Sequence, residues 1–93
     1  MTVTYEQSFY DDFEKIRDKH IIRRAYGAID KLKSTNSLCD VTNIRPMKGA
    51  PGFYRLRFGD YRIGFQVVEE NTIVLLAIDR RGVIYKRFPI NFQ

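Results

Sequence analysis

Arginine side chains recur at close spacing in the second half of the chain, where several of them can reach one surface. Arg55 and Arg57 alternate with apolar neighbours, so both project from the same side of a predicted strand. Arg62 lies on the polar face of the next predicted strand, and a tight turn at residues 59–60 would make that face continuous with Arg55 and Arg57. Because planar guanidinium groups match phosphate oxygens, this spacing predicts a site for an anionic partner.

More cations follow the next predicted strand. Arg80 and Arg81 end that strand, and Lys86 and Arg87 come directly after Tyr85. Arg55, Arg57 and Arg62 together with Arg80 and Arg81 make five arginines, which can line one concave surface with Tyr85. Like charges on neighbouring strands repel one another, and a sheet gathers them where an anion relieves the repulsion. RNA, DNA and an acidic protein each satisfy that condition. The alternative interpretation is that arginines on the wet face of a sheet only keep the protein soluble.

The overall charge agrees with an anionic partner. The chain carries 16 Lys and Arg against 11 Asp and Glu, a formal net charge of +5. Its pI of about 9.6 exceeds the value of about 9 that marks candidate nucleic-acid binders. An apolar content of 44% and an aromatic content of 14% predict a packed structure, and 93 residues suit one domain spanning 1–93.

Two amphipathic helices are predicted ahead of the arginine-bearing strands. Residues 2–7 alternate as a short strand does, and Ser8 offers an N-cap oxygen to a helix that carries Phe9 and Phe13 on one side. After a break near residues 18–20, a second helical stripe is formed by Ile22, Ala25, Tyr26, Ile29 and Leu32.

From residue 53 onward the apolar period switches to two. Residues 53–58 and 61–68 are predicted to form a hairpin that turns at Gly59-Asp60. Residues 72–78 are apolar at almost every position, as in a central strand that is covered on both faces. Residues 83–88 are compatible with one more short strand.

These elements predict an α+β fold with the order β-α-α-β-β-β(-β), in which a helical hairpin packs on a mainly antiparallel sheet. Residues 38–52 contain Pro46, Gly49, Pro51 and Gly52, and we expect a connecting loop there.

Other chemistries find little support in the sequence. His20 is the only histidine and lies among charged residues, while the single cysteine, Cys39, has no partner for a disulfide or a metal cage. We expect neither a metal nor another cofactor, because no ligand spacing or phosphate-binding loop is present. No apolar run reaches membrane-spanning length and no secretory signal is visible, so we expect a cytoplasmic protein without a membrane partner.

Two segments resemble the signature of the RelE/ParE toxin family. The stretch Lys48–Ile63, which contains Tyr-Arg-Leu-Arg-Phe-Gly-Asp-Tyr-Arg, resembles its central motif, and Asp79–Tyr85 resembles its closing motif. The central motif is quite specific, whereas the helical half is generic. Together with the β-α-α lead-in, the resemblance covers nearly the whole chain.

The resemblance implies the toxin of a type II toxin–antitoxin system. Its expected activity is ribosome-dependent, metal-independent endoribonuclease cleavage of mRNA, which inhibits translation. The alternatives are inhibition of DNA gyrase, as by related members, or a catalytically weak protein that binds RNA or the ribosome. The expected partners are the ribosome, mRNA and a cognate acidic antitoxin that forms a hetero-oligomer with the toxin. The implied catalytic positions are Arg62, Arg81 and Tyr85, and the implied RNA- and phosphate-binding positions are Lys48, Arg55, Arg57, Arg80 and Lys86.

The chemistry of these side chains fits metal-free RNA cleavage, in which a 2′-hydroxyl attacks its own phosphate. We assign Arg62 to the phosphate clamp and Arg81 to the same clamp or to protonation of the leaving 5′ oxygen. Tyr85 would stack on a base or orient the hydroxyl. Some family ribonucleases carry lysines where Arg55 and Arg57 stand, and arginine is a poor general base, so the sequence does not identify the proton acceptor.

Overall fold

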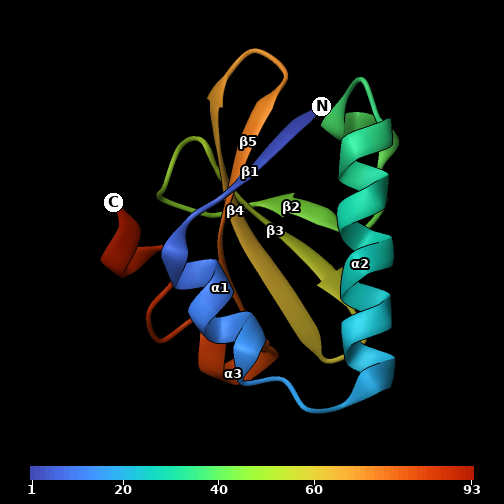
Figure 1. Ribbon diagram of the computed structural model, residues 1–93. Coiled ribbons are helices and arrows are strands. Elements are labelled where there is room, and N and C mark those ends of the chain that lie inside the picture. Colours follow the sequence, from blue (N-terminus) through green and yellow to red (C-terminus); the bar gives the residue numbers. More distant parts are fainter.

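A five-stranded sheet forms the centre of the molecule, and the computed structural model describes all residues from 1 to 93 (Figure 1). The strand order is β1-β5-β4-β3-β2; β1 runs parallel to β5 and the other neighbours are antiparallel. The elements are β1 (Thr2–Tyr5), α1 (Gln7–Glu14), α2 (Lys19–Ser34), a 3₁₀ helix (Leu38–Asp40), β2 (Ile44–Pro46), β3 (Phe53–Phe58), β4 (Tyr61–Glu69), β5 (Thr72–Arg80), α3 (Arg81–Ile84) and a last 3₁₀ helix (Ile90–Phe92).

Helices α1 and α2 cover one face of the sheet and bury the larger apolar core (Figure 1). Helix α2 buries Ala25, Ile29 and Leu32 of its predicted stripe, whereas Tyr26, which was also predicted to belong to it, is 56% exposed. The sheet contributes side chains from β3, β4 and β5, namely Leu56, Phe58, Ile63, Phe65, Ile73, Leu75 and Ile78. The predicted α+β arrangement, with both helices on a mainly antiparallel sheet, is confirmed. No helix combines the length and the apolar character that crossing a membrane requires.

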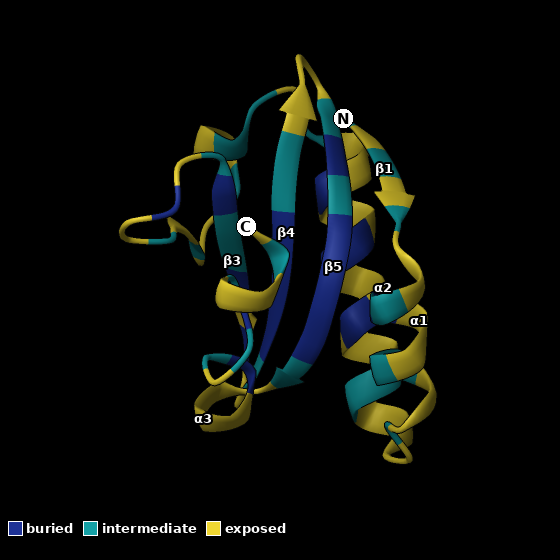
Figure 2. Ribbon diagram, turned by 90° about the vertical axis from the view of Figure 1, so that its left-hand side faces the viewer, coloured by how far each residue is buried: buried dark blue, intermediate teal, exposed yellow.

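The opposite face of the sheet carries a smaller core that the C-terminal segment covers (Figure 2). Ile84 and Phe88, which follow β5, pack with Phe53 and Ala77 of the sheet. Phe88 lies directly over Gly64, since a Cβ atom at Gly64 would fall 2.7 Å from its ring. Strand β5 is therefore covered on both faces, which confirms the prediction made from its apolar run.

The start of the first helix differs from the prediction. Helix α1 begins at Gln7, and its N-cap residue Glu6 makes no side-chain cap bond. The Ser8 hydroxyl donates instead to the Leu76 carbonyl of β5 at 2.6 Å. The prediction of Ser8 as N-cap is therefore wrong, because a tertiary bond to the sheet takes its hydroxyl. The second helix has a side-chain cap: Asp18 accepts a hydrogen bond from the His20 N–H at 2.8 Å.

The predicted loop at residues 38–52 contains an edge strand. Ile44–Pro46 pairs with β3 as β2, and Pro46 occupies its last position. Proline cannot donate a hydrogen bond to a neighbouring strand, but an edge strand leaves one side unpaired and therefore tolerates it. Pro46, which contributed to the prediction of a loop, thus lies in the edge strand of the sheet.

The predicted strand at residues 83–88 is wrong. Strand β5 runs on to Arg80, and the chain then forms the short helix α3 and a further turn in which the Phe88 N–H bonds to the Ile84 carbonyl at 2.8 Å. Strand β1 pairs with β5 only as far as Leu75, and beyond it the Ser8 hydroxyl and the Asp12 carboxylate of α1 bond to the Leu76 carbonyl and the Ile78 N–H on that edge. Ile84 and Phe88, four residues apart, instead point from one side of the turn into the smaller core.

Candidate functional site

Four arginines share the face of the sheet that α1 and α2 leave uncovered. Arg57 of β3 lies directly opposite Arg62 of β4, and Arg55 lies directly opposite Arg45 of β2. Side chains directly opposite one another on antiparallel strands point to the same face. Arg55 is also opposite Gly64, which faces Phe88, so these arginines lie on the side of the C-terminal segment. We call Arg45, Arg55, Arg57 and Arg62 the arginine face.

Arg45 was not among the predicted binding residues, because residues 38–52 were expected to form a loop. In a loop its direction is undetermined, whereas the register of β2 places it beside Arg55. Its side chain is exposed, and Nη1 donates only to the adjacent Ile44 carbonyl, at 3.0 Å. No sequence signal except the flanking alternation of Ile44 and Pro46 points to a strand there. Arg45 extends the row of guanidinium groups to the edge of the sheet.

Arg62 is the most buried charged residue of the chain, with 6% of its surface exposed. Its Nη1 donates to the carbonyls of Gly59 and Tyr61, each at 3.0 Å, and these bonds hold the side chain at the β3–β4 turn. Its Nε is buried without any hydrogen-bond partner. A buried donor of a charged group without an acceptor is unfavourable, so Arg62 has a cost to stability that its two carbonyl bonds do not remove.

No carboxylate neutralises the arginine face. The only ion pairs join Arg87 to Asp12 at 2.8 Å and to Asp79 at 3.1 Å. Asp79 is opposite Arg62 in register, yet its carboxylate is taken by Arg87. Arg57 has one weak polar contact, from Nη2 to Asn43 Oδ1 at 3.3 Å. The positive charges thus lie side by side with no carboxylate in an ion pair with any of them, as at sites that bind phosphates.

Helix α3 brings two more predicted residues to the same end of the sheet. The backbone N–H of Arg81 donates to the Asp60 carbonyl at 2.7 Å, which fixes α3 against the β3–β4 turn beside Arg62. The Arg81 side chain is exposed. Tyr85, half-buried, packs against the smaller core with Phe53 and Phe88. The structure therefore places Arg62 and the backbone of Arg81 at the β3–β4 turn, and Tyr85 follows four residues later.

Three predicted residues lie apart from this group. Arg80 is opposite Tyr61 on the face that α1 covers, where it lines a shallow depression with Ile16. Adjacent residues of a strand alternate in direction, so Arg80 and Asp79 point to opposite faces. Lys48 is exposed in the turn between β2 and β3, and Lys86 is exposed directly after Tyr85.

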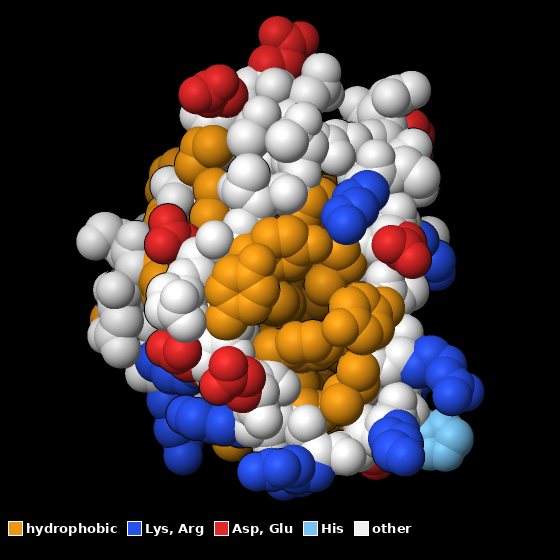
Figure 3. Space-filling model, viewed as in Figure 1, with side chains coloured by type: hydrophobic (Ala, Val, Ile, Leu, Met, Phe, Trp, Pro, Cys, Tyr) orange, Lys and Arg blue, Asp and Glu red, His pale blue; other side chains and the backbone are white.

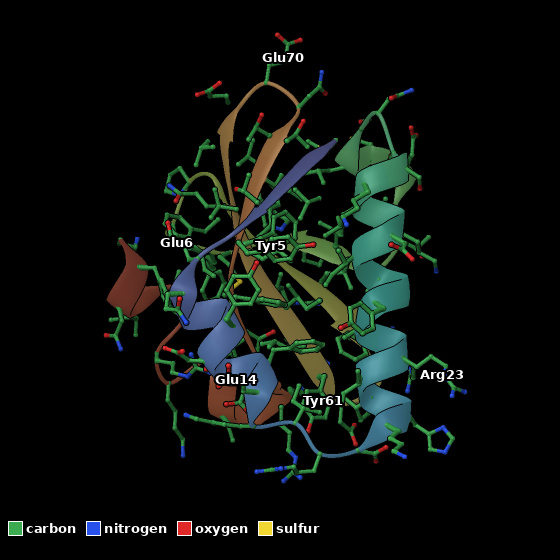
Figure 4. The ribbon with its side chains drawn as sticks, in the orientation of Figure 1. Tyr5, Glu6, Glu14, Arg23, Tyr61 and Glu70 are labelled. Atoms are coloured by element: carbon green, nitrogen blue, oxygen red, sulfur yellow. The ribbon has the colours of Figure 1, made fainter.

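A second surface lies between α1 and α2 on the other side of the sheet. Figure 3 shows an apolar hollow there, and Figure 4 places Tyr5 and Tyr61 at it. Tyr26 of α2 is 56% exposed, and its ring meets the Phe13 ring edge-on at 5.6 Å. Tyr10 is also exposed, and its ring is tilted against the Tyr5 ring with the centroids 5.5 Å apart. We call Tyr5, Tyr10, Phe13, Tyr26 and Tyr61 the aromatic hollow.

No group of three or more His, Cys, Asp or Glu side chains is arranged to hold a metal ion. His20 is exposed near the start of α2, which covers the opposite face of the sheet, and Cys39 is exposed and free. The arrangement on the arginine face is suited to stabilising negative charge on phosphorus. None of its arginines is paired with a carboxylate, and neither is Tyr85, so no side chain there is prepared to act as a general base.

Fold and site together define a small α+β domain with an arginine-bearing sheet face. The sequence model of the family described as "ParE toxin of type II toxin-antitoxin system, parDE" matches residues 3–85. Toxin RelE3 of Methanocaldococcus jannaschii is 34% identical over 90 residues, which are 96% of this chain and 100% of that protein. The chain therefore belongs to the RelE/ParE family of type II toxin–antitoxin toxins.

Solved structures agree with this assignment. The RelB–RelE antitoxin–toxin complex from Methanococcus jannaschii contains a chain that superposes with a TM-score of 0.75 at 31% identity, covering 92% of this chain and 99% of that one. The isolated E. coli RelE toxin superposes with a TM-score of 0.66 over 99% of this chain and 98% of its own. Its 13% identity shows a common fold only.

Proposed function

We propose that this protein is a ribosome-dependent endoribonuclease that cleaves mRNA through its arginine face, Arg81 and Tyr85. The observation that carries the proposal is the placement of Arg57 and Arg62 opposite one another, with no carboxylate paired to either and with Arg81 anchored at the adjacent turn. Such a cluster favours the phosphate group whose negative charge increases as a 2′-hydroxyl attacks it. Membership in a toxin family adds support, because cleavage of mRNA stops growth.

Each side chain has a distinct part in this reaction. Arg62, held by the Gly59 and Tyr61 carbonyls, directs its remaining donors at the scissile phosphate, and Arg57 beside it binds a second phosphate oxygen. Arg81, whose side chain is exposed, contacts the phosphate or the leaving 5′ oxygen. Tyr85 stacks on an unstacked base, since its ring is steadied by the smaller core.

The proton acceptor comes from the ribosome in this proposal. The carboxylate nearest Arg62 in register is Asp79, and it is paired with Arg87. Arginine stays protonated at any physiological pH and does not accept the proton of the hydroxyl. The purified protein should therefore leave naked mRNA intact and cleave the same mRNA during translation.

The test is an in vitro translation reaction in which cleavage is mapped by primer extension. We expect cuts with the wild-type protein, and a loss of about 100-fold or more with Arg81→Gln, the order seen when one electrostatic donor is removed from an active site. The matched control is Arg80→Gln, which removes the neighbouring arginine on the opposite face. Intact mRNA beside a working translation control would refute the nuclease, and inhibition of supercoiling by gyrase in a parallel assay would then favour the alternative activity.

We also propose that an acidic antitoxin binds this protein and that its apolar side chains fill the aromatic hollow. The 31%-identical structural relative was solved as an antitoxin–toxin complex. An exposed aromatic surface is unfavourable in water and is typical of protein interfaces, where tyrosine is enriched. The net charge of +5 would attract an acidic chain to the surfaces around the hollow.

A further inference from the structure

Asp79 and Arg62 occupy positions at which opposite charges normally pair. They lie directly opposite one another on β4 and β5, where Cβ atoms are about 4.5–5.5 Å apart. Nevertheless they form no ion pair. Asp79 Oδ2 bonds to Arg87 at 3.1 Å, and Oδ1 accepts from the Arg80 N–H at 2.7 Å. Arg62 donates only to two backbone carbonyls, and its Nε has no partner.

Arg87 is held in place from two sides. Its Nη2 contacts Asp12 at 2.8 Å as well as Asp79, and the same Asp12 oxygen accepts from the Ile78 N–H at 3.0 Å. Partial burial of the Arg87 guanidinium lowers its pKa, but the hydrogen bonds and charges of Asp12 and Asp79 outweigh this and raise the pKa above its ordinary value. Arg87 therefore stays charged and joins α1, β5 and the C-terminal segment.

We propose that Arg87 is a positioning residue that occupies the Asp79 carboxylate and so keeps Arg62 free to bind a phosphate. If Arg87 is removed, Asp79 has no other cation and turns to its register neighbour Arg62. The ion pair then formed must be broken before RNA binds. The expected effect on RNA binding rests on the proposed function. The pairing of Arg87 with Asp79 is a property of the chain alone.

The experiment measures the affinity for a short single-stranded RNA whose 2′-hydroxyls are methylated, so that it binds without being cleaved. Arg87→Gln should weaken binding about tenfold, the order that a hydrogen bond to a charged group contributes. Adding Asp79→Asn should restore wild-type affinity, because no carboxylate then competes for Arg62. Adding Asp12→Asn instead is the matched control, since it removes the other partner of Arg87, and it should restore nothing.

A second readout follows Arg62 directly. In the wild-type protein Nε of Arg62 has no acceptor, and its Nε–Hε resonance should shift in Arg87→Gln and return in Arg87→Gln/Asp79→Asn. Wild-type RNA affinity in Arg87→Gln would overturn the proposal. The same follows if Arg87→Gln/Asp79→Asn does not regain affinity, or if both double variants regain it equally. If the wild-type protein binds no RNA, the proposed function fails, while the resonance still decides whether Arg87 keeps Asp79 from Arg62.

Discussion

At the scale of single residues, Arg62 combines features that stability alone does not favour. It is buried, charged, unpaired with any carboxylate, and left with an orphaned Nε. Uncompensated buried charges oppose folding, and replacing them by apolar side chains of similar size is often neutral or favourable. Arg62→Met should therefore leave the free energy of unfolding within about 1 kcal/mol of wild type, or raise it, while mRNA cleavage is lost.

Urea denaturation and primer extension on the same preparation check this prediction. If Arg62→Met lowers the unfolding free energy by more than about 2 kcal/mol, Arg62 has a structural role instead. Most surface substitutions change this free energy by no more than about 0.5 kcal/mol, and larger losses come from broken packing or buried hydrogen bonds.

Arg45 permits a separate prediction about RNA binding. If it contacts one phosphate, Arg45→Gln should reduce affinity for single-stranded RNA and lower the slope of log K against log salt by about 0.7, the value for one phosphate contact on a single strand. Arg23→Gln is the control, since Arg23 points away from the sheet on α2 (Figure 4). Fluorescence anisotropy over a range of salt concentrations measures both. An unchanged slope in Arg45→Gln would show that Arg45 contacts no phosphate of the RNA.

The sequence reveals part of the arginine face and misses the rest for definite reasons. Alternation alone places Arg55, Arg57 and Arg62 on one face, and the register agrees. Arg80 and Arg81 are adjacent, but β5 ends at Arg80 and α3 begins at Arg81. Their side chains therefore belong to different elements. Where a strand ends is set by neighbouring strands and by packing, which local spacing does not contain.

At the scale of elements, the two helices and the three central strands follow from apolar periodicity, whereas β2 and α3 do not. Strand β2 has three residues and is defined by its pairing with β3. Helix α3 exists because Ile84 and Phe88 find a core on the sheet behind them. Both elements are decided by tertiary contacts between distant segments, and those contacts leave only weak local signals.

Contact between the C-terminal segment and the sheet gives an element-scale prediction. A Cβ at Gly64 would lie 2.7 Å from the Phe88 ring, which is fully buried and has no room to move. Gly64→Ala should lower the free energy of unfolding by about 1–3 kcal/mol, as overpacking does. Gly82→Ala, where a Cβ meets no atom within 4 Å, is the matched control and should be neutral or slightly stabilising. Equal effects of both changes in thermal or urea unfolding would contradict the packing argument.

At the scale of the whole molecule, two faces of one sheet have separate tasks in the proposed function. The arginine face takes RNA, and the aromatic hollow on the opposite side takes the antitoxin. Tyr26 is more than half exposed, so Tyr26→Ala should weaken the toxin–antitoxin complex by about tenfold or more, as truncation of interface tyrosines commonly does. Its stability and its mRNA cleavage should change little.

Calorimetric titration with the co-expressed partner, after separation and refolding, measures this affinity. Val68→Ala is the control, because Val68 is similarly exposed at the far end of β4. If both variants bind the antitoxin as tightly as wild type, the antitoxin occupies a surface other than the hollow.

The parallel pairing of β1 with β5 ties the beginning of the chain to a segment made much later. Thr4 of β1 donates its hydroxyl hydrogen to the Ile73 carbonyl, 69 residues away in sequence. Proteins rich in such distant contacts fold slowly, and a nascent polypeptide cannot form these contacts until its second half has been translated. Helix α3, which carries Arg81, is made later still. In the proposed function, an unfinished copy therefore lacks the assembled phosphate site and cannot cut the message from which it is being made.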